Sequence, residues 1–287
     1  MSRTVYVNGA YCPEEDARVS IFDRGFLFAD AVYEVTTVLD GKLVDFDGHM
    51  ARLGRSLEAL TMTLPVSEDE LLDIHRQLVT ENALREGMIY LQLSRGAPGD
   101  RDFHFPDPEE TRPTLILFTQ EKAIVDSALA ARGAKVAFVP DLRWGRVDIK
   151  TVQLLYPSMA KMEAEGKGAD DAWLVKDGLV TEGSSNNAWI VTPEGTLVTR
   201  QLSHDILPGI TRATVLRLAR ERQMKVEERA FTTEEALAAK EAFITSASSF
   251  VTPVISIDGH PIGEGEPGPV AKAMREIYID EARKTAI

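Results

Sequence analysis

Residues 172–191 read AWLVKDGLVTEGSSNNAWIV, and this stretch decides the class of fold. Two apolar runs, 172–176 and 179–181, are separated by Asp177-Gly178, a pair suited to a tight hairpin turn. A third apolar run, 188–191, follows a polar loop. Strands that lie so close together in sequence pair antiparallel, because parallel pairing needs a long crossover. The stretch therefore predicts an antiparallel meander.

The rest of the second half predicts further short strands together with several helices. Further strands are expected at 135–139, 196–199, 242–246 and 254–257. Helices are expected at about 152–165, from near Gly209, after a capping box formed by Thr232 and Glu235, and after Pro269. Because strands and helices do not alternate regularly, a doubly wound nucleotide-binding fold is not favoured.

The first half predicts strands, then helices, then strands. Hairpin signals lie at 5–9 and at 33–46, the second with Asp40-Gly41 as its turn. Asp47 can cap a helix in which Met50, Leu53, Leu57 and Leu60 recur at helical spacing. A second helix is expected from Ser67 to about Glu86, and strands at 88–94 and 114–119. This order is typical of an α+β fold.

Composition and charge exclude several classes of protein. The chain has 287 residues, 44% hydrophobic and 27% charged, which is ordinary for a globular protein. A net charge of −13 argues against binding to nucleic acid or to anionic membranes. Cys12 is the only cysteine, so the sequence excludes a disulfide framework and indicates a reducing compartment. The sequence contains neither a membrane-spanning run nor a signal peptide, and we expect a cytoplasmic protein.

The organisation we expect is a smaller N-terminal domain at 1–119, a short charged linker at 120–123 and a larger domain at 124–287. The length of the chain suits two such domains.

Lys150 is the first candidate for chemistry, because it lies in the apolar and β-branched run 147–155. Burial lowers the pKa of a lysine amine, and a neutral amine is what a Schiff-base catalyst needs. The alternative is an edge-strand lysine that points into water.

Glu182 follows a strand and precedes Gly183 and four small polar residues. It is either part of a long hydrophilic loop or an inward-pointing carboxylate within a network of hydroxyl and amide groups. Leu207-Pro208-Gly209-Ile210-Thr211 opens a helix, whose free N–H groups and dipole favour an anion. A second group of small donors, 245–249, follows a strand and could bind the same anion.

His49 and Arg52 lie three residues apart on the first helix, away from its apolar stripe. They form either an ordinary solvated face or a site where Arg52 offers its permanent charge to a phosphate. An amine, a carboxylate and several phosphate donors together are what pyridoxal phosphate requires.

In their order along the chain, these motifs resemble the branched-chain and D-amino acid aminotransferase family, the fold-type IV pyridoxal phosphate enzymes. The motifs are Asp23-Arg24-Gly25-Phe26, Val32-Tyr33-Glu34-Val35, His49-x-x-Arg52, Tyr90-Leu91-Gln92, Arg95-Gly96, Asp148-Ile149-Lys150, Thr181–Asn186, Gly209–Arg212 and Thr245-Ser246. The resemblance implies an N-terminal α/β sandwich and a C-terminal pseudo-barrel of mostly antiparallel strands.

The resemblance also implies the role of each residue. Lys150 would form the Schiff base and move the proton, and Glu182 would pair with the pyridine nitrogen. Leu207 would pack against the ring. The phosphate would be held by Arg52, the amides of Ile210 and Thr211, the Thr211 hydroxyl, and Ser246 with Ala247. Arg143 and Arg146 are either solvated or line the entrance to the cofactor.

Tyr33-Glu34 is more similar to the D-amino acid enzymes than to the branched-chain ones. By that similarity, Tyr33, an arginine and a histidine would bind the substrate carboxylate, the last two on a loop from the partner subunit of a homodimer. Arg101 matches the arginine, but Phe103 stands where the histidine is expected, with His104 one residue later.

The expected reaction is a ping-pong transfer of the amino group from a D-amino acid to a 2-oxo acid. D-alanine is the favoured donor, and 2-oxoglutarate is the favoured acceptor. Four alternatives stay open at this point. They are an (R)-selective amine transaminase, a branched-chain L-amino acid aminotransferase, an aminodeoxychorismate lyase, and a non-catalytic protein that binds a phosphorylated ligand.

Overall fold

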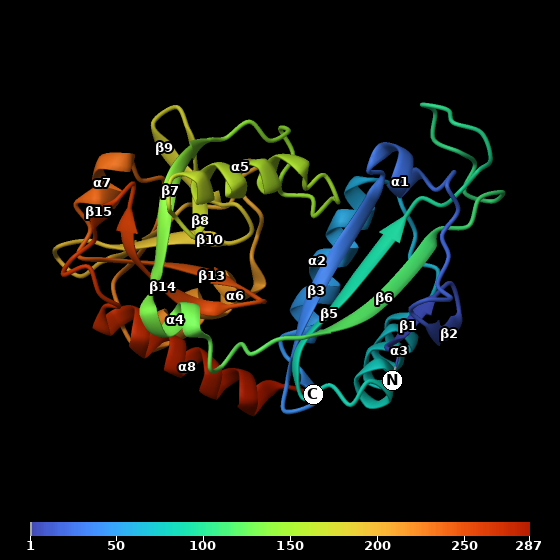
Figure 1. Ribbon diagram of the computed structural model, residues 1–287, viewed down its shortest axis with the longest axis horizontal. Helices are drawn as coiled ribbons and strands as arrows, with labels where there is room; N and C mark the ends of the chain where they lie inside the picture. Colours follow the sequence, from blue (N-terminus) through green and yellow to red (C-terminus); the bar gives the residue numbers. More distant parts are fainter. Residues whose placement is uncertain (1) are drawn as a thin grey trace. The chain divides into compact units, whose positions relative to one another are not determined.

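The computed structural model describes residues 2–287, and the chain divides into two compact units (Figure 1). The first unit comprises the chain up to Ala123 together with Ile149–Gln153 and Thr285–Ile287. The second comprises Ile124–Asp148 and Leu154–Lys284. Two short segments thus belong to the first unit although they are distant from it in sequence.

The first unit contains one antiparallel sheet of six strands, in the order β2-β1-β6-β5-β3-β4. Its strands are β1 (Thr4–Val7), β2 (Ala10–Pro13), β3 (Ala31–Leu39), β4 (Lys42–Leu43), β5 (Glu86–Ser94) and β6 (Thr114–Glu121). Its helices are α1 (Arg24–Phe28), α2 (Phe46–Ala59) and α3 (Glu68–Glu81). Figure 1 shows α2 and α3 against the sheet.

Successive side chains along each strand point to opposite faces, so the two faces of this sheet differ. On β5, Ile89 and Leu91 are fully buried in a core with Leu53 and Leu57 of α2. Tyr90, which lies between Ile89 and Leu91, points to the opposite face and is only half-buried. One face of the sheet therefore packs on the helices, and the other carries side chains such as Tyr90.

Helix α2 begins slightly earlier than the sequence predicts. Its N-cap is Asp45, in a left-handed conformation (φ 52°), and Asp47 lies in the first turn. An acidic residue there is still favourable, because it faces the positive end of the helix dipole. Helix α3 ends earlier than expected: Ala83 turns left-handed (φ 47°), and Glu86 already begins β5.

The second unit contains a mixed sheet of nine strands, in the order β12-β11-β10-β13-β14-β7-β8-β9, with β15 on β14. The strands are β7 (Ala134–Pro140), β8 (Asp171–Lys176), β9 (Leu179–Gly183), β10 (Asn187–Val191), β11 (Leu197–Thr199), β12 (Val226–Glu228), β13 (Glu241–Ser246), β14 (Phe250–Ile257) and β15 (His260–Pro261). The helices are α4 (Ala128–Arg132), α5 (Leu155–Gly166), α6 (Ile210–Glu221), α7 (Thr233–Leu237) and α8 (Pro269–Thr285). Most pairs are antiparallel, but β7 pairs parallel with β8 and β14, and β11 with β12.

The turn between β9 and β10 is shaped by a buried carboxylate. Asp171 accepts hydrogen bonds from the Ser184 hydroxyl and from Asn186 Nδ2, the latter at 2.8 Å. Gly183 N also donates to Asn186 O at 2.8 Å. The small polar residues of this motif therefore mainly fix the turn, and they deliver Glu182 at the end of β9.

Residues 149–153 lie against β3, where Thr151 forms an isolated bridge with Val32. Tyr33 N donates to Lys150 O (3.0 Å), and Val152 N donates to Ala31 O (3.1 Å). Ile149 is buried in the core of the first unit. These contacts place Lys150 beside the start of β3. No helix among residues 2–287 is both long and apolar enough to cross a membrane.

Candidate active site

Lys150 is half-buried and lies against an aromatic ring. Its Nζ is 4.0 Å from the ring centre of Tyr33, and its backbone N donates to the Ser56 hydroxyl at 3.3 Å. The backbone of the lysine is thus fixed on both sides, by β3 and by α2. An edge-strand lysine pointing into water, the alternative interpretation of the sequence, does not describe this arrangement.

Tyr33 begins a row of aromatic rings on the sheet face opposite the helices. It stacks on Tyr90 with ring centres 5.5 Å apart, and Tyr90 stacks on Phe118 at 4.9 Å. Burial raises the pKa of Tyr90, whose hydroxyl donates to Gln92 Oε1 at 2.8 Å. Tyr33 is therefore held by its neighbours in the position where it meets Lys150.

Arg52 and His49 are buried around the carboxylate of Glu34. Arg52 donates from Nε and Nη2 to the two oxygens of Glu34, each at 2.8 Å, and His49 Nδ1 lies 2.7 Å from Oε2. Burial alone would raise the pKa of Glu34, but the charge and hydrogen bonds of Arg52 and His49 outweigh it and hold the pKa far below its usual range. The interpretation of this pair as a solvated face is wrong, because α2 turns both residues toward β3.

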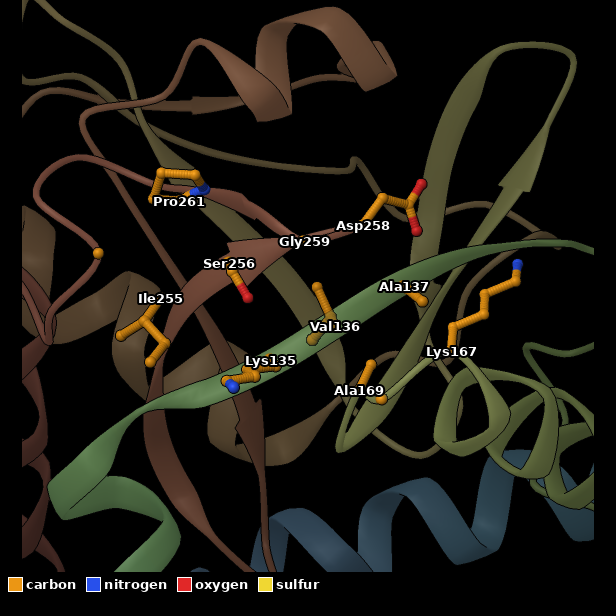
Figure 2. A pocket seen from close by; sticks show the side chains of 12 residues that line it. Lys135, Val136, Ala137, Lys167, Ala169, Ile255, Ser256, Asp258, Gly259 and Pro261 are labelled. Carbon is orange, nitrogen blue, oxygen red and sulfur yellow. The ribbon is translucent and has the colours of Figure 1, made fainter.

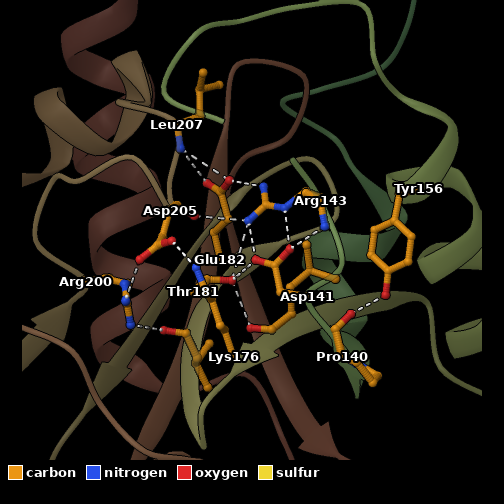
Figure 3. A network of polar contacts seen from close by, with 12 residues as sticks. Pro140, Asp141, Arg143, Tyr156, Lys176, Thr181, Glu182, Arg200, Asp205 and Leu207 are labelled. Carbon is orange, nitrogen blue, oxygen red and sulfur yellow. Dashed lines mark hydrogen bonds and ion pairs between the residues drawn. The ribbon is translucent and has the colours of Figure 1, made fainter. Parts of the chain in front are cut away.

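Glu182 is buried on β9, with only 4% of its surface exposed. Its carboxylate accepts hydrogen bonds from Asn187 Nδ2 at 2.9 Å and from Leu207 N at 3.1 Å, and it forms an ion pair with Arg143 (Figure 3). Burial raises the pKa of Glu182 by more than Arg143 lowers it. Of the polar motif that follows Glu182, Asn187 makes the side-chain contact with it, while Ser184 and Asn186 bind Asp171.

Asn187 links Glu182 to the segment before α6, because its Nδ2 donates to both Glu182 and the Leu207 carbonyl. A Cβ on Gly209, the N-cap, would lie 2.0 Å from Asn187 Oδ1, so only glycine fits this close approach. The first N–H groups of a helix have no partner within the helix, and glycine offers no side chain to bind them. Ile210 and Thr211 are the residues that carry these groups.

The second group of donors forms a tight turn after β13. Ser246 Oγ lies 2.7 Å from Ser249 Oγ, and the turn ends at Phe250, a fully buried residue in the left-handed region (φ 58°). Such a conformation is unusual for a bulky residue and marks a turn that its surroundings enforce. Thr245, at the start of the turn, pairs with Asn187 across the sheet. Asn187 thus touches all three parts: the carboxylate, the helix start and the strand that leads into the turn.

Arg101 and Phe103 lie on an exposed loop of the first unit. The Arg101 guanidinium is 4.8 Å from the ring centres of both Phe28 and Phe103, and the two rings meet edge-on at 5.4 Å. His104 contacts Asp102 instead, at 3.1 Å, and its side chain is 94% exposed. Phe103 therefore occupies the place beside Arg101.

The backbone of this loop is anchored by Arg24, a buried residue. Arg24 Nη1 donates to the carbonyls of Asp102 (2.6 Å) and His104 (3.1 Å), and its Nε donates to Asp30 at 2.7 Å. The motif that contains Arg24 therefore serves the loop that carries Arg101.

Comparison with known proteins decides the family. The amino-transferase class IV family matches the chain over residues 31–257, a range that includes Tyr33, Lys150 and Glu182. The chain belongs to the class IV aminotransferases.

The relatives of this aminotransferase include two similar enzymes. The D-alanine aminotransferase of Bacillus licheniformis is 39% identical over 98% of this chain and 99% of its own. The D-alanine aminotransferase of Staphylococcus aureus (strain MSSA476) is 35% identical over 95% of each chain.

Solved structures of class IV aminotransferases share the fold. The T.th. branched-chain amino acid aminotransferase with pyridoxamine 5'-phosphate superimposes with a TM-score of 0.87 at 27% identity, over 98% of this chain and 94% of that one. The Thermoproteus uzoniensis branched-chain aminotransferase with norvaline has a TM-score of 0.85 at 27% identity, over 97% and 94%. The predicted α+β fold of fold-type IV, the aminotransferase class and the pyridoxal phosphate cofactor are thus confirmed.

The residues of the second unit fit that cofactor. Pyridoxal phosphate presents a ring nitrogen that takes a proton and a phosphate that needs N–H and O–H donors. Glu182 is a buried carboxylate, and the start of α6 and the turn at Ser246 supply donors. Lys150 and Arg52 belong to the first unit.

Sequence reasoning missed Ser56 and left Asn187 and Arg143 open as residues of the candidate site. Ser56 carries no sequence signal of its own, because it is defined by a contact with Lys150, a residue distant in sequence. Asn187 belongs to the polar motif after Glu182, but the motif does not indicate which of its residues contacts the carboxylate. Arg143 was left open between a solvated and an entrance-lining position, and it instead contacts Glu182. Its spacing of two from Asp141, with which it pairs, is the signal that could have indicated a fixed side chain.

A hollow of about 630 Å³ on the second unit has Lys135, Lys167 and Asp258 among its side chains (Figure 2). Among residues 2–287, none of the site residues predicted from the sequence lines it. Asp258 accepts a hydrogen bond from Phe138 N, and Lys167 donates to Phe138 O, each at 3.0 Å. These groups hold the backbone of β7, and we assign the hollow no part in the reaction. Residues 2–287 also contain no group of three acidic, histidine or cysteine side chains that could hold a metal ion.

Proposed function

We propose that this protein is a D-amino acid aminotransferase, which moves the amino group of a D-amino acid to a 2-oxo acid in a ping-pong reaction. D-alanine and 2-oxoglutarate are the favoured pair. The observation that carries the proposal is the 39% and 35% identity to two D-alanine aminotransferases over nearly the whole chain. The pair Tyr33-Glu34 on β3 supports the same branch of the family.

Lys150 is the base of the reaction. Pyridoxal phosphate, when bound, supplies an aldehyde for the amine and a ring that accepts electrons. Lys150 Nζ would take the proton from Cα of the substrate and deliver it to C4′ of the cofactor, the carbon that receives the amino group. The Tyr33 ring, 4.0 Å from Nζ, limits where the amine can move. The backbone contacts of Lys150 to β3 and Ser56 fix the position of the lysine Cα, so only the side chain moves during the proton transfer.

Glu182 holds a proton on the ring nitrogen. The start of α6, the turn at Ser246 and the side chain of Arg52 hold the phosphate. Leu207, whose N donates to Glu182, packs against the ring. The donors for the phosphate are the Ile210 and Thr211 amides, the Thr211 hydroxyl, and Ser246 with Ala247. Thr211 Oγ1 lies 3.5 Å from the Tyr278 hydroxyl, so its side chain has a fixed neighbour.

The substrate carboxylate is bound by Tyr33 and by the loop that carries Arg101 and His104. This loop completes the site of the partner subunit, so the working unit is a homodimer in the cytoplasm. The exposure of His104 in the single chain is consistent with a role toward a partner. Phe103 beside Arg101 makes the loop more apolar than an arginine and histidine pair would.

A panel of D- and L-amino acids and of (R)- and (S)-amines tests the proposal. We expect the purified protein to lose the visible absorbance of bound pyridoxal phosphate with D-alanine, and to recover it with 2-oxoglutarate. Small (R)-amines should react at least about 100-fold more slowly, because they lack the carboxylate and a well-placed charge pair to it contributes about 2–3 kcal/mol. L-leucine should also react more slowly than D-alanine, because its opposite configuration misplaces the Cα proton when the carboxylate is bound. Faster reaction with L-leucine would assign the protein to the branched-chain enzymes, and faster reaction with (R)-amines to the amine transaminases. Repeated release of pyruvate from aminodeoxychorismate, in the absence of a 2-oxo acid acceptor, would indicate a lyase.

Arg24→Met should loosen the Arg101 loop. Removal of two hydrogen bonds to loop carbonyls is expected to raise KM for the D-amino acid about tenfold, with little change in kcat. A tenfold change in KM is about the free energy of one charged hydrogen bond. Steady-state kinetics and limited proteolysis within the loop measure the effect. The matched control is Arg18→Met, an exposed arginine whose Nη1 donates to the carbonyls of Glu15 and Ala17. An unchanged KM in a loop that is cut faster would separate the loop from substrate binding.

A further inference from the structure

Arg143 is the one charged side chain in direct ion contact with Glu182 among the described residues 2–287. Its Nη1 donates to Glu182 Oε1, while its Nε and Nη2 bind the two oxygens of Asp141 at 2.9 and 2.7 Å. Nη2 also donates to the Asp205 carbonyl at 3.1 Å. Figure 3 shows the guanidinium between the two carboxylates. The planar guanidinium thus binds Asp141 through Nε and Nη2 and Glu182 through Nη1.

Asp141 is itself fixed, which makes Arg143 rigid. The Thr181 hydroxyl donates to Asp141 Oδ2 at 2.7 Å, and Thr181 precedes Glu182 on β9. One strand therefore holds both carboxylates on either side of the guanidinium. Arg143 and Asp141 are both nearly enclosed, with 9% and 6% of their side chains exposed, so solvent screens this cluster only weakly.

The charges of the cluster bear on where a shared proton lies. A carboxylate and a ring nitrogen that share one proton can hold it on either atom, and the weaker base loses it. Arg143 touches the carboxylate itself, so it stabilises the ionised form of Glu182 and makes it the weaker base. Burial acts in the opposite direction and raises the pKa of Glu182, and the charge of Asp141 adds to that. Arg212 is the further charged group whose field reaches Glu182.

We propose that Arg143 is a positioning residue that keeps the Glu182 carboxylate ionised and aimed, so that the shared proton lies on the ring nitrogen of the cofactor. Asp141 orients Arg143 for this task. The inference rests on the proposed role of Glu182 opposite the ring nitrogen, and it adds a residue that acts through Glu182 without touching the reacting atoms.

The test is the 15N chemical shift of pyridoxal phosphate labelled at the ring nitrogen and bound to the enzyme. The wild type is expected to give a protonated ring nitrogen near neutral pH. Arg143→Gln should move the shift toward the unprotonated value and weaken cofactor binding about tenfold, whereas Arg143→Lys, which keeps the charge, should stay closer to the wild type. Arg146→Gln is the matched control: Arg146 lies three residues further on, is 42% exposed in its side chain, and pairs with Asp148.

A second variant protects the test against loss of fold. Arg143→Gln leaves the buried Asp141 without its charged partner, which is costly, and the double variant Arg143→Met with Asp141→Asn removes both members of the ion pair. Thermal unfolding of the cofactor-free proteins verifies the fold, and the double variant is expected to show the same change in 15N shift. A protonated ring nitrogen in either folded variant overturns the role of Arg143.

Glu182→Gln distinguishes this failure from failure of the proposed function. If the 15N shift changes in Glu182→Gln but not in the Arg143 variants, Glu182 keeps its role and Arg143 loses its own. If Glu182→Gln leaves the shift at the wild-type value, the assignment of Glu182 is wrong, and the role of Arg143 is overturned with it.

Discussion

Lys150→Ala is expected to reduce transamination by at least about 10³-fold, because it removes both the amine that binds the cofactor and the base that moves the proton. The half-reaction with D-alanine, followed through the absorbance of the cofactor, measures the loss. Borohydride reduction followed by mass spectrometry should attach pyridoxal phosphate covalently to the wild type at Lys150 and leave the variant unmodified.

The variant should fold normally. The structural contacts of Lys150 run through its backbone, with Tyr33 N on its carbonyl and its own N on Ser56. Alanine keeps both contacts and loses the approach of Nζ to the Tyr33 ring, which contributes about 1 kcal/mol at a half-exposed position. Lys42→Ala, an exposed lysine of the same unit, is the control for removal of a lysine. A half-reaction in Lys150→Ala at the wild-type rate would remove Lys150 from the chemistry.

Local sequence signals predicted a turn and a helix cap, because these are determined by residues that are close together in sequence. The capping box at Thr232 is confirmed: Thr232 Oγ1 accepts from Glu235 N at 3.1 Å, and Glu235 accepts from Thr232 N at 2.9 Å. The turn at Asp177-Gly178 joins β8 and β9 as expected. The parallel pairs of β7 with β8 and β14 were not predicted, since they join strands that are distant in sequence and no local pattern specifies them.

The candidate site could be predicted in part for the same reason. A motif indicates which residue type occurs where, and Lys150 and Glu182 are proposed as site residues on this basis. It does not indicate that Lys150 lies beside Tyr33, because that contact depends on the docking of 149–153 on β3. Periodicity likewise placed Arg52 off the apolar stripe of α2, but only the fold brings Glu34 opposite it.

The second large effect concerns stability, in the buried pair of Glu34 and Arg52. Arg52→Met should lower the free energy of unfolding by about 3–5 kcal/mol, because it leaves the Glu34 carboxylate buried with His49 as its remaining partner among these three residues. Chemical unfolding of the cofactor-free protein measures the loss. Arg55→Met, an exposed arginine on the same helix, is the control and should change stability by less than about 0.5 kcal/mol. A loss of similar size in both variants would contradict the importance of the buried pair.

The pair also predicts a pH dependence with a definite sign. The pKa of Glu34 is lowered on folding, so its contribution to stability is fully present above the ordinary carboxyl pKa and is lost as the pH falls toward the lowered one. Below about pH 5, the wild type should therefore lose stability faster than Glu34→Gln, in which this titration is absent. Equal slopes in the two proteins between about pH 5 and about pH 3 would show that Glu34 does not titrate on unfolding.

The double variant Glu34→Gln with Arg52→Met separates the structural role of Arg52 from its proposed role toward the phosphate. Removal of both charges leaves no uncompensated ion, so stability should recover most of the loss seen in Arg52→Met. Affinity for pyridoxal phosphate should not recover, because the cation that the phosphate would bind is still missing. If affinity returns together with stability, Arg52 serves only to pair with Glu34. In that case, the helix start at Ile210 and Thr211 and the turn at Ser246 hold the phosphate without it.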